Sequence, residues 1–444
     1  MVVVLSTYAG TLMAILATVS SVNSSESARR LALLFAFLFA GLVAFSHPVA
    51  FLRTLSRHAW TGLLVLLALA SSAWSAAPDL TLKRGLILLG TTLLGVYLAT
   101  RFRPRDILAL LAVTMGVAAL MSMALGLFDP GRGIGQGVYE GDWLGLYAHK
   151  NALGLFMGLA TIVFVLTARA AAKRRTLLWA MAGLSFALVL LSRSATSLVA
   201  TSGVLVLLPL LYVLRERSTR TVLLLLLMLL ILGSITMVVS LNLEAALQVV
   251  GKDTSLTGRV PLWKFLVDQV QDRPWLGAGY SAFWMGWTGP SEFVSNVTGG
   301  WYPSHAHNGL LNLALQLGGL GVVLFLVGMT TAAYRALRSL RDGPPEGGIF
   351  SLSMLGFLVL TSMSESTLLA HDSLFWLLYT VAVFLPVNTS GSTRQPFGRS
   401  PSQFSRTDVR VAGRRGGASL GVKRRLREIR QGDGRISRGP ERSG

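Results

Sequence analysis

The stretch His305–Gly321, "HAHNGLLNLALQLGGLG", begins with polar residues and becomes predominantly apolar after its first few positions. His305, His307 and Asn308 lead directly into an apolar run that continues well beyond the quoted stretch. A helix needs roughly 20 apolar residues to cross a hydrocarbon core of about 30 Å, and this run is long enough. The stretch therefore predicts a transmembrane helix at 308–333 with two histidines at one of its ends.

Apolar runs of this kind recur along nearly the whole chain. Of its 444 residues, 52% are hydrophobic and only 14% are charged, whereas soluble domains carry roughly 25% charged residues. Backbone amides in lipid must be paired internally, and the runs are too long and too rich in Leu and Ala for barrel strands. We therefore predict an all-α, polytopic membrane protein with about twelve transmembrane helices. The expected spans lie at 4–20, 31–46, 60–77, 85–100, 106–127, 151–168, 176–192, 195–214, 221–241, 308–333, 348–364 and 371–387.

The loops between these spans differ in charge, and the difference predicts an orientation. Arg and Lys cluster in alternate short loops, near Arg57, Arg103, Arg174, Arg217 and Arg338. The positive-inside rule places these loops and both chain termini in the cytoplasm. The two substantial loops on the opposite side are 128–150 and 242–307, and the second, between spans nine and ten, is by far the larger.

The C-terminal residues 388–444 differ in composition from the membrane domain, which we expect to occupy residues 1–387. This tail is rich in Ser, Gly and Arg, with fourteen Lys and Arg against four Asp and Glu, which is typical of a disordered segment. A basic juxtamembrane tail favours anionic lipid headgroups over nucleic acid, so we expect the bilayer as its partner. The chain has no cysteine, which excludes disulfides, thiolate chemistry and Cys-based metal sites.

Polar residues with chemical potential gather on the expected external side. Four of the six histidines lie at external ends of spans: His149, His305, His307 and His371. Lys150 and Asn151 follow His149 in the expected first turn of a span, so their donors face the aqueous boundary. They could bind a substrate. Alternatively, Asn151 is a helix cap and Lys150 extends to the interface.

Two arginines occupy external turns. Arg193 lies in "LSRSATS", between spans seven and eight, and Arg259 lies in "SLTGRVPLW". An arginine between apolar helices is costly unless it has an anionic partner. A guanidinium group matches phosphate oxygens with two parallel hydrogen bonds, so the pair favours a bound phosphate, with headgroup contact as the alternative. Beyond Arg259 we expect an amphipathic helix from Pro261 to near Pro274, with these residues on one face: Leu262, Phe265, Leu266 and Val270.

The quoted histidines admit three interpretations. If the helix starts near Ala306, a polar stripe runs along it, which must face protein or a water-filled cavity: His305, Asn308, Asn312 and Gln316. A metal site needs three or four ligands, but His-x-His supplies two and carboxylates nearby are sparse, so we expect neither a metal nor a cofactor. Histidine suits proton transfer or phosphate contact near neutral pH. The remaining alternative is a capped helix with hydrogen bonds to neighbouring helices.

Four motifs in this order carry a family resemblance: "YAHKNALG", "SRSATS", "TGR…LW…RPWLGAGY" and "SHAHNGLLNLALQLGGLG". Over roughly residues 30–385 the chain resembles the O-antigen ligase/polymerase superfamily of bacterial envelope glycan transferases, and the His-Lys-Asn block resembles the exopolysaccharide-polymerase branch. Thr257 stands where a serine is common in that family, and the basic tail is not part of the family pattern.

The resemblance implies an activity and a location. Members transfer a glycan from undecaprenyl diphosphate to an acceptor hydroxyl outside the bacterial inner membrane, without a metal. Polymerases extend the next lipid-linked repeat unit, and ligases use lipid A-core. Other polysaccharide assembly and export proteins are expected partners. The residues expected to be catalytic are His307, His305 and Arg259. Those expected to bind substrate are Arg193, His149, Lys150, Asn151 and Asn308.

Two other classes remain as alternatives. A lipid-linked oligosaccharide flippase or a transporter would place polar residues at the membrane midplane on broken helices. An intramembrane protease would need a Ser–His pair or two aspartates within the spans, and Ser185 and Ser192 have no convincing partner in the sequence. The clustering at one face favours the glycan transferase.

Overall fold

The computed structural model describes residues 56, 58–171, 173–214, 259–286, 289–298, 300, 303–343, 345–371, 373–389 and 444. Long helices dominate these residues. Their bounds are α4 Ala59–Ala70, α5 Pro78–Arg101, α6 Pro104–Phe128, α8 Lys150–Ala170, α9 Arg175–Leu191, α10 Ala195–Leu214, α13 Arg259–Asp272, α15 Gly309–Asp342, α16 Pro345–Ser362 and α17 Leu374–Thr389. Short elements complete the described part: α7 Pro130–Gly133, α14 Val294–Val297, and the 3₁₀ turns η1 Ser71–Ala73, η2 Gly137–Tyr139 and η3 Gly289–Ser291.

The protein is a polytopic helical membrane protein. Among the described residues, six helices are long and apolar enough to cross a bilayer, and three shorter apolar helices accompany them. The described residues contain no strand, only an isolated bridge between Ile134 and Trp143. Three of the expected spans, 4–20, 31–46 and 221–241, lie outside the described residues, as does nearly all of the tail 388–444.

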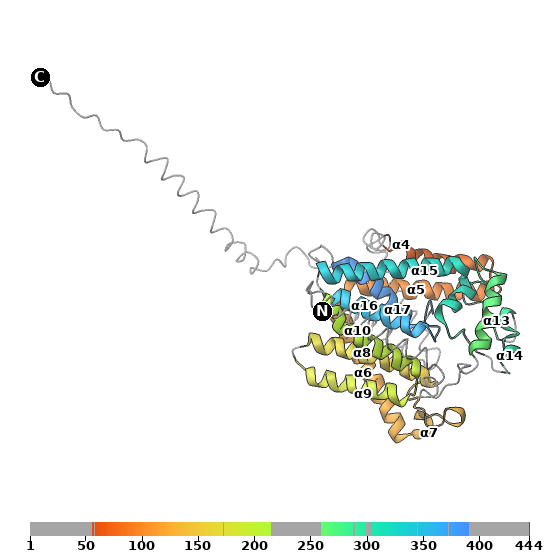
Figure 1. Cartoon of the computed structure of the whole chain (residues 1–444), viewed down its shortest axis with the longest axis horizontal. Helices are drawn as coiled ribbons and strands as arrows, with labels where there is room; N and C mark the ends of the chain where they lie inside the picture. Colours follow the sequence, from red (N-terminus) through yellow and green to blue (C-terminus); the bar gives the residue numbers. More distant parts are fainter. Residues whose placement is uncertain are drawn as a thin grey trace, which may run out of the picture. The chain divides into compact units, whose positions relative to one another are not determined.

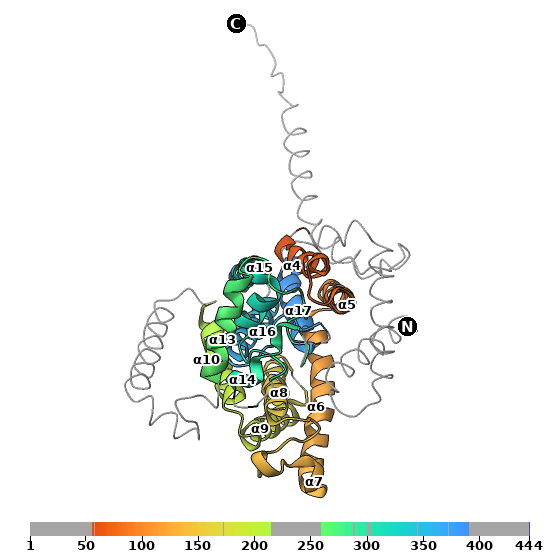
Figure 2. The same cartoon turned by 90° about the vertical axis from the view of Figure 1, so that its right-hand side faces the viewer.

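The long helices form two groups that α16 joins. One group contains α4, α5, α15 and α17, and the other contains α6, α8, α9 and α10; α16 packs against members of both. Figures 1 and 2 show the two groups at opposite sides of α16. The helix α13 runs across the ends of the long helices, at the end where α14 also lies (Figure 1). We call this end the site end.

Two glycines in α8 allow the neighbouring helix α10 to approach it closely. A Cβ atom built on Gly158 would lie 2.2 Å from Thr201 Oγ1, and one on Gly154 would lie 2.5 Å from Ser197 Oγ. Small residues at such positions let helix backbones pack tightly where no hydrophobic effect drives association. The close packing fixes where the first residues of α8 lie.

Most predicted spans match a helix, but three boundaries were wrong. The expected span 60–77 ends at Ala73, because α5 begins at Pro78, seven residues before the predicted position. Proline suits a first helical turn, and Asp79 in that turn complements the positive end of the helix dipole. The predicted span 308–333 continues to Asp342, where Arg338 pairs with Asp342 at 3.6 Å.

A break inside α15 is filled by another segment of the chain. Gly318 has φ 62° and ψ −165°, which interrupts the helix. The carbonyls of Leu315 and Gln316 accept from the backbone N–H groups of Ala278 and Gly279, at 2.9 and 3.0 Å. In the opposite direction, the N–H groups of 319 and 320 donate to the carbonyls of 274 and 275, at 2.7 and 3.3 Å. Irregular backbone at membrane depth requires such internal pairing.

The predicted amphipathic helix is confirmed as α13. Its expected apolar face is the buried one: Leu262 and Leu266 are fully buried, and Phe265 and Val270 pack against the same cluster. This cluster also contains Ala306 and Leu315, so α13 lies against the start of α15. Trp263 strengthens the contact, because its Nε1–H donates to the carbonyl of Ala306 at 2.9 Å.

Candidate functional site

The first residues of α8 form one side of the site. His149 is the N-cap residue, and its Nδ1 accepts a hydrogen bond from the backbone N–H of Asn151 at 3.1 Å. The alternative in which Asn151 caps the helix is therefore wrong. Because Nδ1 accepts, a neutral His149 carries its proton on Nε2, which lies 3.2 Å from Tyr139 Oη. Burial lowers the pKa of His149, which favours this neutral form.

Two predicted cations converge on a buried carboxylate that the sequence analysis had not singled out. Lys150 Nζ lies 2.7 Å from Asp142 Oδ2, and Arg193 Nη1 lies 3.7 Å from Asp142 Oδ1. Arg193 occupies the turn between α9 and α10 with φ 48°, a left-handed conformation that is unusual for a side-chain-bearing residue. Its side chain is 66% exposed, whereas that of Asp142 is 8% exposed. Asp142 thus holds two cations with at least one accessible to solvent.

The histidine pair lies just before α15 rather than on it. The helix begins at Gly309, and Asn308 is the N-cap residue, whose Oδ1 accepts from the N–H of Leu311 at 3.0 Å. The two imidazole rings of His305 and His307 lie side by side, with centroids 4.1 Å apart. The backbone N–H of His307 donates to His305 Nδ1 at 3.2 Å. His307 has φ 50°, so the pair is held in a strained turn.

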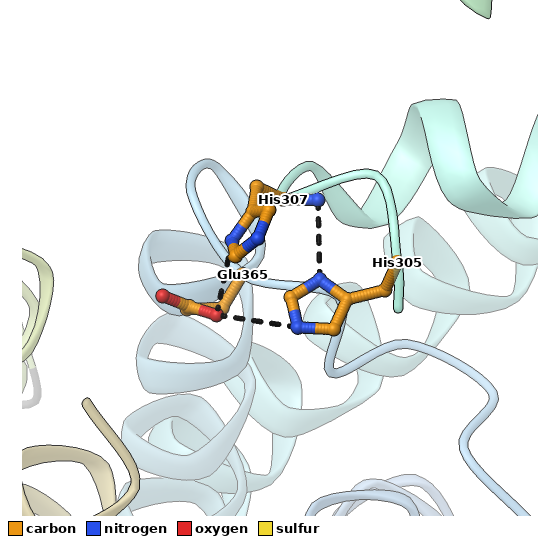
Figure 3. A group of neighbouring side chains, drawn as sticks. All are labelled: His305, His307 and Glu365. Atoms are coloured by element: carbon orange, nitrogen blue, oxygen red, sulfur yellow. Dashed lines mark hydrogen bonds and ion pairs between the residues drawn. The ribbon is translucent and has the colours of Figure 1, made fainter. Parts of the chain in front are cut away.

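Glu365 joins the histidine pair to α8. It follows α16, is buried, and accepts a hydrogen bond from Asn151 Nδ2 at 2.8 Å through Oε1. Its other oxygen, Oε2, lies 3.7 Å from His307 Nδ1 and 4.0 Å from His305 Nε2. Figure 3 shows this oxygen facing both rings. The predicted residues Asn151, His305 and His307 therefore meet at a carboxylate that sequence reasoning missed.

The same arrangement supplies a third potential metal ligand. Ligating atoms of His305, His307 and Glu365 lie within 4.8 Å of one another. No metal was expected here because carboxylates near the histidines are sparse in the sequence, but the fold brings Glu365 from 58 residues beyond His307. Three ligands of these types match the donor set of a catalytic zinc site. The side chains could therefore hold either a cation or an exchanging proton.

The predicted polar stripe on α15 faces protein. Asn312 Oδ1 accepts from Trp284 Nε1 at 2.8 Å and from the N–H of Ala306 at 3.4 Å. Gln316 Oε1 accepts from the N–H of Ser281 at 2.8 Å. These two residues anchor the loop after α13 to the helix. One part of the predicted stripe was wrong: the helix begins at Gly309, so His305 precedes the helix and does not lie on it.

Arg259 and His371 are the other two residues singled out on the predicted external side. The helix α13 begins at Arg259, but the side chain of Arg259 lies outside the described part, so its predicted role stays a prediction. His371 contacts Tyr280 edge-on, with ring centroids 6.5 Å apart, and its carbonyl accepts from Thr91 Oγ1 at 2.5 Å.

The comparisons with known proteins bear on this site directly. Residues 180–326 match the family model described as "O-Antigen ligase", and this window contains Arg193 and the histidine pair. The chain is 25% identical over 372 residues to "Exopolysaccharide production protein ExoQ" of Rhizobium meliloti (strain 1021), covering 79% of this chain and 82% of that protein. A protein of Rickettsia conorii, whose name proposes a polysaccharide ligase, is 32% identical over 74 residues, which cover 16% of this chain and 18% of that protein.

The resemblance to the O-antigen ligase/polymerase superfamily is confirmed. The comparisons support a role as a polysaccharide ligase or polymerase and suggest an enzyme of the glycosyltransferase type. Apart from Arg259, the residues that the resemblance assigns to the site lie at the site end, where imidazoles, two cations and the buried carboxylates Asp142 and Glu365 are found. Side chains of these types can bind an anion and accept a proton.

Proposed function

We propose that the chain transfers a glycan from undecaprenyl diphosphate to an acceptor hydroxyl at the outer face of a bacterial inner membrane. The proposed acceptor is the next lipid-linked repeat unit, so the product is exopolysaccharide or O-antigen. One observation carries the proposal: the cations Lys150 and Arg193 and the imidazoles His305 and His307 gather at one end of the helices and are linked by Asn151. The length of the match to the exopolysaccharide production protein favours the polymerase.

The proposed reaction follows from the charges at the site. As the acceptor oxygen attacks the anomeric carbon with inversion, the bond from that carbon to the diphosphate breaks. The electron pair remains on undecaprenyl diphosphate. Lys150 and Arg193, joined by Arg259 if its predicted role holds, neutralise this leaving group, and a histidine accepts the acceptor's proton. Because the protein supplies the positive charge, we propose that no metal is needed.

A second candidate is transfer onto lipid A-core. The description of the matching family model and the name of the Rickettsia conorii protein favour this ligase reaction. Its chemistry at the donor is the same, and only the acceptor differs. A transporter function has less support. Transporters often contain interrupted transmembrane helices, and α15 is interrupted at Gly318. The freed backbone groups at Gly318 bind the segment 274–279 rather than facing an open cavity.

Reconstitution separates these candidates. The purified protein is placed in liposomes with lipid-linked glycan extracted from cells that lack its gene. A polymerase converts this glycan into lipid-linked oligomers and releases undecaprenyl diphosphate, whereas a ligase forms product only when lipid A-core is added. Movement of the glycan across the bilayer without either product would refute the proposal in favour of a transporter.

Variants test the assignment within the same assay. His307→Ala is expected to lower the transfer rate by about 10²- to 10⁴-fold if it removes a general base. His371→Ala is a matched control, because His371 lies outside the cluster around Glu365. Arg193→Ala should raise the donor KM, and Arg338→Ala, which removes an exposed arginine paired with Asp342, should not. Equal activity of the His307 and His371 variants would remove His307 from the mechanism.

A further inference from the structure

Glu365 occupies an unusual position for a carboxylate. It follows an apolar helix, only 6% of its surface is exposed, and burial of an ionised group is costly unless the charge is paired and hydrogen-bonded. Oε1 accepts a hydrogen bond from Asn151, and Oε2 lies within ion-pair distance of the two imidazoles, 3.7 Å from His307 Nδ1 and 4.0 Å from His305 Nε2. The fold therefore stabilises a buried negative charge between α8 and the start of α15.

The hydrogen bond within the histidine pair fixes the state of His305. Its Nδ1 accepts from the backbone N–H of His307, so the lone pair lies on Nδ1 and a neutral His305 carries its proton on Nε2. That Nε2 faces Glu365. In neutral His305, Nδ1 therefore accepts a hydrogen bond and Nε2 carries the proton, which makes this side chain a poor acceptor for a substrate proton.

The ring of His307 has the opposite orientation. Its Nδ1 faces Glu365 Oε2 at 3.7 Å. A proton on Nδ1 is favoured by the carboxylate, and it leaves the lone pair on Nε2. The backbone around the ring is fixed, because Ala306 accepts from Trp263 and donates to Asn312. The backbone beside His307 is therefore fixed, and from it the ring presents Nδ1 to the carboxylate.

We infer that Glu365 is a positioning residue, which holds His307 with its proton on Nδ1 so that Nε2 accepts the proton of the acceptor hydroxyl. This inference rests on the proposed function. In the step, the acceptor O–H proton moves to Nε2 while the new glycosidic bond forms and the bond to the diphosphate breaks. The imidazolium then lies beside the carboxylate, and its proton passes to water after the undecaprenyl diphosphate leaves. Asn151, which Glu365 also binds, is adjacent to Lys150 and connects the base to the donor cations.

A wild-type measurement tests the inference without any variant of Glu365. The protein is labelled with ¹⁵N-histidine, placed in lipid bilayers at neutral pH and studied by solid-state NMR. The signals of His307 are identified by their loss in His307→Gln. The expected result is a protonated Nδ1 and an unprotonated Nε2. A proton on Nε2, or coordination of a tightly bound metal ion by Nδ1, would overturn the inference.

Kinetics of Glu365→Gln provide the second test. This variant keeps the size of the side chain but presents one oxygen to several donors, so His307 loses its alignment. We expect kcat to fall by about 10²-fold or more, as for displaced or wrongly protonated bases, with the donor KM changed less than about threefold. Glu365→Asp, which keeps the charge, should recover part of kcat. The matched control is Glu346→Gln, since Glu346 pairs with Arg105 at the opposite end of the helices.

The outcomes separate this inference from the proposed function. A kcat of Glu365→Gln within about twofold of the wild-type value overturns the role of Glu365 while the transferase stands. A wild-type protein that forms neither polymer nor lipid A-linked product refutes the proposed function. In that case, or if Glu365→Gln does not fold, the NMR measurement alone decides whether Glu365 sets the proton position of His307.

Discussion

At the scale of single residues, proton positions follow from which ring nitrogen accepts a backbone hydrogen bond. His149 and His305 each accept at Nδ1 from an N–H two residues further along the chain. Each therefore acts as a local cap and keeps its proton on Nε2 when neutral. His307 alone of the three directs Nδ1 at a carboxylate. Three histidines with similar sequence surroundings thus have two different roles.

The cap at His149 predicts a dependence of stability on pH. Burial is the main cause of its lowered pKa, opposed by Glu365 and Asp142 and assisted by Lys150 and His307. The folded state then holds fewer protons than the unfolded state, so the stabilisation is present above about pH 6.5, the ordinary value for histidine, and is lost as the pH falls below it. His149→Asn keeps a capping oxygen without titrating.

We therefore expect the Tm of the detergent-solubilised wild type to fall more between about pH 7.5 and pH 5.5 than the Tm of His149→Asn. The other five histidines are the same in both proteins, so the difference isolates His149. Parallel curves for the two proteins would show that the neutral cap does not contribute to stability.

Chelation tests the proposal that protein cations replace a metal. Incubation with EDTA followed by gel filtration should leave the transfer rate within about twofold of the untreated rate, because Lys150 and Arg193 neutralise the diphosphate. The measurement is transfer with and without added Mg²⁺, Mn²⁺ or Zn²⁺, together with elemental analysis. Loss of activity that one metal restores would assign His305, His307 and Glu365 as its ligands and refute metal independence.

The residue types of the site could be predicted from the sequence, but their partners could not. The predicted His149, Lys150, Asn151, His305 and His307 converge, because they occupy helix ends on one side of the membrane. The phosphate expected as the partner of Arg193 stays a prediction, and the carboxylate that Arg193 contacts within the protein, Asp142, was not predicted. Glu365 offered a signal, since a carboxylate directly after an apolar span is costly. Its pairing with His307 depends on α16 lying between the two helix groups.

At the scale of elements, the break in α15 shows how two distant segments complete each other's hydrogen bonds. The glycines at 318–319 mark a weak point in the sequence, but the segment that fills it lies about 40 residues earlier. The presence of this helix was therefore predictable from its apolar pattern, whereas the break and the continuation to Asp342 were not. The "RPWLGAGY" motif gains a structural role from this geometry, because its backbone forms the inserted segment.

Gly318→Ala tests this junction. A Cβ atom at Gly318 would lie 2.2 Å from the carbonyl carbon of Trp275, and its φ of 62° disfavours any side chain. The backbone conformation alone costs about 1–3 kcal/mol for a residue with a Cβ, and the contact adds to this cost. We expect a clear fall in the Tm of the detergent-solubilised protein.

The control is Gly183→Ala in α9, where a Cβ atom would meet no other atom within 4 Å. Alanine at this helical position should leave the Tm unchanged or raise it, since glycine costs up to about 1 kcal/mol there. Similar Tm values for Gly318→Ala and Gly183→Ala would contradict the proposed junction.

At the scale of the whole molecule, the charged ends of the helices are distinct. Helices run alternately between the site end and an end that carries Arg101, Arg103, Arg105 and the basic residues at 173–175 and 335–341. Because the apolar pattern fixes where the chain turns, this alternation was predictable from the sequence. The rule for basic loops then assigns the site end to the outside, where a lipid-linked donor glycan is found if the proposed function is correct.

Cysteine accessibility tests this orientation without background labelling, because the chain has no cysteine of its own. Asn296→Cys places a thiol on an exposed residue of α14, and Lys173→Cys places one on an exposed residue between α8 and α9. In intact spheroplasts, a membrane-impermeant maleimide should label Asn296→Cys and should label Lys173→Cys only after the membrane is permeabilised. Neither substitution touches the residues around Glu365 or Asp142, so both variants should retain transfer activity. The reverse labelling pattern would place His307 and the paired cations in the cytoplasm, on the wrong side for an undecaprenyl-diphosphate donor in the outer leaflet, and would refute the proposed reaction.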